Sequence, residues 1–138
     1  MTYSELEHTA DIRMKITADT IENLVLESGF ALSHTLYGDY DHNIQGIYSY
    51  PINITSNNIE DMIVTYLSEL LFLVETEYLV PTDFKITIIN NNITGIVTGV
   101  PFDKSKHSGG IEVKGISYSG ISLKHIKSEY ELIVIFDI

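Results

Sequence analysis

Residues 57–74 read NNIEDMIVTYLSELLFLV, and this stretch is the most strongly patterned part of the chain. Asn57 is placed to cap a helix, and Glu60 follows three residues later in the spacing of a capping box. Behind them, apolar residues recur three and four positions apart: Ile59, Met62, Ile63, Tyr66, Leu67, Leu70, Leu71 and Val74. This spacing predicts a helix with one buried apolar face.

A second helix is predicted before this one. Asp19 is placed to cap it, Glu22 completes the box, and Gly38 ends it. Its apolar stripe consists of Ile21, Leu24, Val25, Ser28 and Leu32. Apolar and polar residues alternate in the remaining segments, which predicts strands at residues 12–18, 48–54, 84–89, 93–100, 111–118, 122–126 and 130–136. Asn90-Asn91-Asn92 predicts a hairpin turn, and Pro51 favours a sheet edge or a bulge.

These elements predict an α+β fold, a two-layer sandwich in which two helices pack on a mostly antiparallel sheet. The length of 138 residues fits one domain, residues 1–138, with no internal repeat or linker. Cysteine is absent, which excludes disulfides and thiolate metal ligands.

The net charge of −11 is unevenly distributed. Residues 1–84 hold fourteen Asp and Glu against Arg13 and Lys15, whereas residues 85–138 hold six Lys against five acids. So few cations disfavour direct nucleic-acid binding. An acidic face could bind a basic protein, or could simply keep the chain in solution. The acidic N-terminus lacks a signal-peptide pattern and no apolar run could cross a membrane, so we expect a cytoplasmic protein.

The first candidate site is Glu7-His8-Thr9-Ala10-Asp11. His8 and Asp11 could act as acid and base or as metal ligands. The same residue types also build tight turns, so the pattern by itself does not decide between these readings.

The second candidate site is the end of the sequence, where Asp137 precedes Ile138 and its carboxylate. If this strand lies beside Asp11, three carboxylates converge, and their repulsion requires a cation or a raised pKa. Oxygen ligands favour Ca²⁺ or Mg²⁺ over Zn²⁺. The alternative is a frayed, solvated terminus.

The third candidate is the segment after the polar loop that contains His107. Glu112, Lys114 and Tyr118 have the same parity, which predicts that they share one strand face with Ile116. Lys114 could neutralise an anionic pocket, or could simply be solvated. Gly109-Gly110 lacks the spacing of a phosphate-binding loop.

Taken in order, four segments resemble the archease family. They are residues 6–12 (LEHTADI), residues 67–77 (LSELLFLVETE), His107 with residues 112–118 (EVKGISY), and the closing residues 135–138 (IFDI). The resemblance spans almost the whole chain, and its specificity lies in the ordered set.

The resemblance implies a non-enzymatic protein that assists the GTP-dependent RNA ligase of tRNA splicing. Family members promote guanylylation of the ligase's active-site histidine and so permit multiple turnover. Carried over by motif, the ligands of a divalent cation would be Asp11, Asp137 and Ile138. That cation would be Ca²⁺, with Mg²⁺ or Mn²⁺ as alternatives. Lys114 matches the family's functional lysine, and His8, Glu112 and His107 lie in the matching segments.

Two positions depart from the family pattern. Ser119 stands where the family usually has histidine, which weakens a proton-transfer role, and Arg13 stands where glycine is frequent.

Two other functions remain open. One is a general binding module or chaperone for RNA-modifying enzymes such as a tRNA methyltransferase. The other is a metal-dependent hydrolase that uses His8 and Asp11.

Overall fold

The computed structural model describes residue 2 and residues 11–138. The order of elements is β1 (Asp11–Ala18), α1 (Ile21–Tyr37), β2 (Tyr48–Ile54), α2 (Ile59–Glu77), β3 (Leu79–Ile89), β4 (Asn92–Pro101), β5 (Gly115–Ile116), β6 (Ser122–Ile126) and β7 (Glu129–Asp137). Both predicted helices and most predicted strands are present, so the α+β class is confirmed.

The strands form two antiparallel sheets rather than the single sheet that was predicted. In the first sheet, β7 pairs with β1 along one edge and with β5 and β6 along the other. The second sheet has the order β2-β4-β3, so β2, which contains Pro51, is an edge strand as expected.

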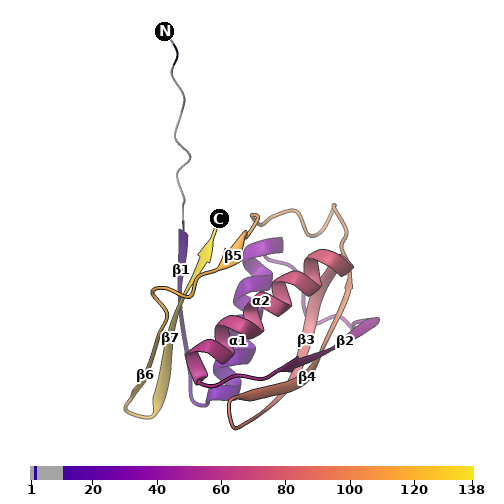
Figure 1. Cartoon of the computed structure of the whole chain (residues 1–138). Coiled ribbons are helices and arrows are strands. Elements are labelled where there is room, and N and C mark those ends of the chain that lie inside the picture. The colour runs from indigo at the N-terminus through magenta and orange to yellow at the C-terminus, as the bar shows by residue number, and fades with distance from the viewer. Residues whose placement is uncertain (1, 3–10) are drawn as a thin grey trace.

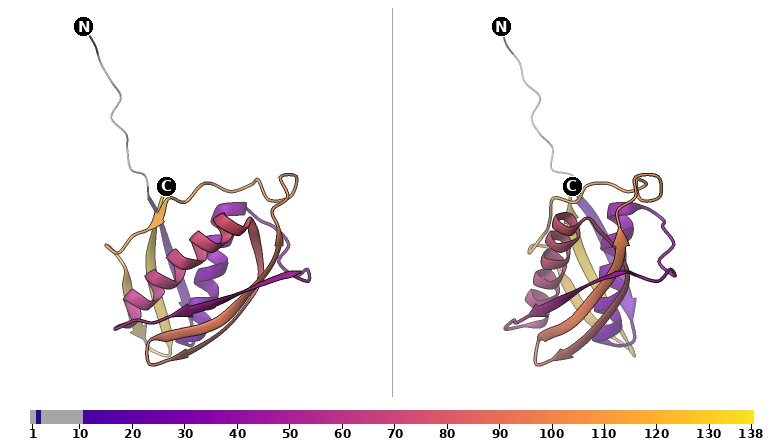
Figure 2. Two further views of the ribbon diagram at one scale, coloured as in Figure 1. Left: turned by 45° about the vertical axis from the view of Figure 1, so that its right-hand side comes forward. Right: turned by 90° about the vertical axis from the view of Figure 1, so that its right-hand side faces the viewer.

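The two helices lie between the sheets and contact strands of both (Figure 1). α1 packs against β1 and β7 on one side and β3 on the other, while α2 packs against β5 and the second sheet. This arrangement explains why α2 has a wide buried face, which comprises Met62, Ile63, Val64, Tyr66, Leu67, Leu70, Leu71 and Val74. The views of Figure 2 show how α2 crosses the second sheet.

The helix caps differ by one residue from the prediction. Thr20, not Asp19, caps α1 by accepting from the Asn23 N–H at 3.1 Å. Asn58, not Asn57, caps α2 by accepting from the Asp61 N–H at 2.8 Å. In both places two adjacent residues have side chains that can cap a helix, and the second of the two is the cap.

The strand predicted at residues 111–118 is wrong over most of its length. Only Gly115 and Ile116 pair with β7, because β6 occupies the rest of that edge. Ile116 is buried whereas Glu112, Lys114 and Tyr118 are exposed, so these four side chains do not share a face.

Candidate functional site

The candidate site lies where β1 pairs with β7, the first and last strands of the described chain. β1 and β7 pair in a register that sets Asp11 directly opposite Asp137 and Ile12 opposite Phe136. Phe136 is buried, so side chains alternate and both aspartates lie on the outer face of the sheet. The condition that the second candidate site required, that the closing strand lies beside Asp11, is therefore met, and Figure 1 shows the two strand ends at one end of the molecule.

The short strand β5 borders Asp137 on its other side. The Lys114 N–H donates to the Asp137 main-chain oxygen at 2.7 Å, and Gly115 stands opposite Asp137 in the register. A Cβ at Gly115 would lie 3.9 Å from Asp137 Oδ2. Since glycine has no side chain, this flank of the carboxylate stays open to a ligand. The sequence alone gives no signal for this role of Gly115, which lies within residues 112–118.

Lys114 joins this group through its backbone, and its side chain is exposed. Glu112 is also exposed and lies toward the end of α2, where it contributes to the environment of Glu75. Burial, and then the charge of Glu112, raises the pKa of the Glu75 carboxyl. Glu75 and Glu112 are therefore neighbouring carboxylates, in addition to the pair of Asp11 and Asp137 on β1 and β7.

The carboxyl end of α2 lies near Glu112 and Tyr37. Its last turn contains no basic residue, so nothing on the helix offsets the negative end of the helix dipole. Burial, and then the charge of Glu75, raises the pKa of the nearby Tyr37 to about 12.

His107 has a structural role that its motif did not reveal. Its ring is buried against Tyr37, Tyr40 and Phe102, and its Nδ1 accepts from the Asp103 N–H at 3.0 Å. Burial lowers the pKa of the imidazole, although Asp103 opposes the shift. The neutral ring thus holds the loop that leads to Lys114, and any further role of His107 stays a prediction.

Of the remaining residues considered in the sequence, His8 lies outside the described part of the chain, whereas Ser119 and Ile138 lie within it. Glu7, Thr9 and Ala10 lie outside it as well. Ser119, which replaces the family histidine, lies in a turn where its Oγ is 2.9 Å from Ser117 Oγ. Ile138 directly follows Asp137 and packs against the core.

Among residue 2 and residues 11–138, no three His, Asp or Glu side chains gather as a ready-made metal site. In the same part of the chain, neither helix has the length and apolar character needed to cross a membrane.

Comparison with known proteins gives a consistent result. The model of one family, the Archease protein family, matches residues 3–138. An archease-like protein of Drosophila melanogaster is 32% identical, with 100% of this chain and 91% of that protein covered. The archease of Methanosarcina mazei is 26% identical, with 99% and 95% covered. The crystal structure of a Thermotoga maritima archease, described as a possible chaperone, shares the fold with a TM-score of 0.72 at 17% identity, covering 100% and 98%.

Proposed function

Because the chain belongs to the archease family, we propose that it is a non-catalytic activator of the GTP-dependent RNA ligase of tRNA splicing. In this proposal the protein promotes guanylylation of the ligase's active-site histidine and so allows the ligase to act repeatedly. The observation that carries the proposal is the register of β1 and β7, which puts two motif aspartates of the family side by side.

The proposal includes a divalent cation, most simply Ca²⁺, held by Asp11, Asp137 and main-chain or carboxylate oxygen of Ile138. Two carboxylates directly opposite each other on one sheet face repel, and a bound cation relieves that repulsion. The donors are hard oxygens without thiolate, which fits Ca²⁺, Mg²⁺ or Mn²⁺, and water would complete the shell. The open flank at Gly115 leaves space for those waters.

The cation would neutralise the carboxylates and hold the two strand ends in a single arrangement. Lys114 would then be the group that reaches the partner, because its backbone is fixed to Asp137 while its side chain is exposed. An RNA ligase needs a basic groove for its substrate, and the excess of acidic side chains in residues 1–84 is complementary in charge to such a groove.

The test is ligase turnover measured with Asp11→Asn and Asp137→Asn proteins. Both substitutions keep the side-chain shape and remove the charge, so the protein should stay folded while the ligase stops after a single turnover. Glu129→Gln, an exposed carboxylate near the start of the same β7, is the matched control and should support full turnover. Unimpaired multiple turnover with both aspartate variants would refute the mechanism.

A second function is favoured by the description of the Thermotoga maritima neighbour as a possible chaperone. On that alternative, an acidic face would bind RNA-modifying enzymes such as a tRNA methyltransferase. Charge reversal at the exposed Asp39, Asp41 and Glu60 would then weaken binding, while Asp11→Asn and Asp137→Asn would have little effect. The two sets of variants therefore separate the two functions.

A further inference from the structure

A groove of about 310 Å³ lies between helix α2 and the edge strand β2. Its β2 wall is the continuous segment 51–54, and its α2 wall consists of Glu69, Phe72 and Leu73. Among the described strands β2 pairs with β4 alone, so the edge of β2 that borders the groove is open. The groove therefore has space for a further segment of polypeptide.

Phe72 is the most exposed side chain of the groove wall that is apolar. It is 66% exposed, whereas the neighbouring Leu73 is half-buried and packs against the core. A single exposed apolar side chain is ordinary on a protein surface. The significance of Phe72 comes from the charged groups that lie on the same side of α2.

Two carboxylates flank the apolar part of this groove. Glu69 and Glu77 are eight residues apart on α2, with Leu73 midway, so they share one face of the helix. The Tyr50 hydroxyl donates to a Glu77 carboxylate oxygen at 3.3 Å, which places Glu77 beside the start of the β2 wall. At the rise of an α-helix, the Cα atoms of the two glutamates are about 12 Å apart.

No nearby basic residue neutralises these carboxylates. Helix α2 and strands β2 and β4 contain no Lys or Arg, and Lys85, the one basic residue of the second sheet, lies on β3, two strands from β2. Within residues 11–138, neither Glu69 nor Glu77 forms an ion pair. The charges beside the groove have one sign, which favours a basic occupant.

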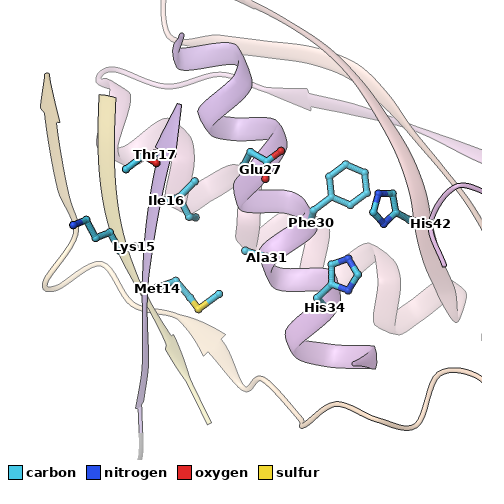
Figure 3. Close-up of a pocket in the computed structure, with 9 residues that line it drawn as sticks. All are labelled: Met14, Lys15, Ile16, Thr17, Glu27, Phe30, Ala31, His34 and His42. Carbon is cyan, nitrogen blue, oxygen red and sulfur yellow. The ribbon is translucent and has the colours of Figure 1, made fainter. Parts of the chain in front are cut away.

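The larger groove between β1 and α1 differs in this respect (Figure 3). Both Lys15 and Glu27 line it, so charges of opposite sign lie along its walls. Its charges therefore favour neither an acidic nor a basic segment.

The spacing of the two glutamates indicates the pattern of a matching segment. In an extended chain alternate side chains share a face, and residues four apart are separated by about 13 Å. Two basic residues four apart, with an apolar residue midway, would therefore reach both carboxylates and the apolar surface between them. The eight Lys and Arg residues of this chain never occur four apart, which disfavours a second copy as the occupant.

We propose that the α2–β2 groove binds an extended segment of a partner protein with the pattern basic-x-apolar-x-basic. One basic side chain, best an arginine, pairs with Glu69 and stacks on Phe72, which lies three residues away on the helix. The other basic side chain pairs with Glu77, and the apolar side chain packs on Leu73.

Side chains provide most of the recognition in this proposal. Pro51 has no N–H group to donate, so an added segment cannot form a continuous hydrogen-bonded ladder with β2. The interaction uses neither Asp11 nor Asp137, and it can therefore hold or fail independently of the proposed function.

The experiment titrates the ¹⁵N-labelled full chain with a peptide that contains Arg-Ser-Leu-Ser-Arg, at low ionic strength, and follows the amide shifts by NMR. We expect saturable shifts in residues 51–54 and 69–77. A peptide with the same residues in the order Arg-Arg-Ser-Leu-Ser has the same charge but the wrong spacing, and it should bind at least about five-fold more weakly.

Two pairs of variants locate the site. Phe72→Ala should weaken binding about ten-fold, whereas Ile89→Ala, at a residue of β3 that is 65% exposed, should have no effect. Glu69→Lys should also weaken binding about ten-fold, because it replaces an attraction with a repulsion. Glu27→Lys makes the same change of charge at an exposed position of α1 and should leave binding within about two-fold of the wild type. Circular dichroism checks that each variant is folded.

Three results would overturn the proposal. One is the absence of saturable shifts in residues 51–54 and 69–77. Another is equal binding of the two arginine peptides, or an equal loss with Glu27→Lys, because either would indicate nonspecific attraction to an acidic protein. The third is self-association of the chain in sedimentation that Phe72→Ala abolishes, which would identify a second copy as the occupant.

Discussion

Two buried tyrosines, Tyr40 and Tyr66, differ in whether the side-chain hydroxyl has a hydrogen-bond partner among the described residues. The Tyr40 hydroxyl donates to the Pro81 carbonyl oxygen at 2.6 Å. Tyr66 is fully buried in α2, and its hydroxyl has no hydrogen-bond partner among the described residues. The hydroxyl of Tyr66 instead lies near Gly29, where an added Cβ would approach it to 3.1 Å. A buried polar group without a partner lowers stability, whereas a satisfied one raises it.

The first prediction compares the removal of each hydroxyl. Tyr66→Phe should raise the free energy of unfolding by about 1 kcal/mol, because an unsatisfied buried donor is lost. Tyr40→Phe should lower it by about 1 kcal/mol, because the buried Pro81 carbonyl loses its partner. Urea denaturation with an unchanged m-value measures both. A destabilising Tyr66→Phe would mean that its hydroxyl has a partner in solution.

We expect the buried imidazole of His107 to make the free energy of unfolding depend on pH. Burial lowers the pKa of its imidazole in the folded state, so the unfolded chain binds the proton more readily. The stabilisation that this neutral ring provides is therefore complete above the unfolded pKa of about 6.5 and is lost as the pH falls through the lower folded pKa. Protonation would also remove the acceptor of the Asp103 N–H.

We expect the wild-type protein to lose more stability between neutral pH and mildly acidic pH than His107→Gln does. The comparison cancels the titration of the carboxyl groups, which both proteins share. Urea denaturation at several pH values measures the free energy of unfolding of both proteins. If this free energy changed equally with pH in both, His107 would titrate alike in the folded and unfolded states.

At the scale of elements, the loop between β4 and β5 is held on the carboxyl end of α1. The Ile111 N–H donates to the Thr35 carbonyl oxygen at 2.8 Å. Gly38 caps α1 with φ of 80° and packs tightly on Gly109, so that a Cβ at Gly38 would lie 2.8 Å from Gly109 Cα. The helix end thus positions the chain that later carries Lys114 to Asp137.

This contact predicts that Gly38→Ala lowers the free energy of unfolding by about 1–3 kcal/mol, through a positive φ and the close approach of the loop. Gly109→Ala is the matched control on the facing residue. Its added Cβ would meet Gly38 Cα at 3.5 Å, which is ordinary contact, so its effect should stay within about 1 kcal/mol. Thermal and urea unfolding measure both variants, and equal losses would contradict the asymmetry.

At the scale of the whole molecule, strand β7 joins parts of the chain that are far apart in sequence. It pairs with β1, β5 and β6, and its central side chains Leu132, Val134 and Phe136 are fully buried. Ordering β7 therefore orders the candidate site, so a cation bound there should stabilise the entire fold.

The last prediction is that Ca²⁺ raises the Tm of the wild-type protein and that a chelator reverses the shift. A ligand that binds only the folded state at a hundred times its Kd adds about 2.7 kcal/mol. The double variant Asp11→Asn with Asp137→Asn should show no shift and, without cation, should be at least as stable as the wild type because the repulsion is gone. A calcium shift that survives in the double variant would place the cation elsewhere.

The sequence by itself determined the local structure and the family. Helical spacing gave α1 and α2, alternation gave β1, and Asn90 and Asn91, both with positive φ, form the predicted hairpin turn. These elements depend on residues that are close together in the sequence, so the sequence is sufficient to predict them. The family could be predicted because its motif segments occur in order along the chain.

Only the tertiary structure decided which strands pair. The division into two sheets, the shortness of β5 and the register of Asp11 with Asp137 depend on partners separated by up to the whole chain. Alternation records that a segment has one buried face, but not which strand lies beside it. The motifs could name Asp11 and Asp137, and the pairing of β1 with β7 put them opposite each other.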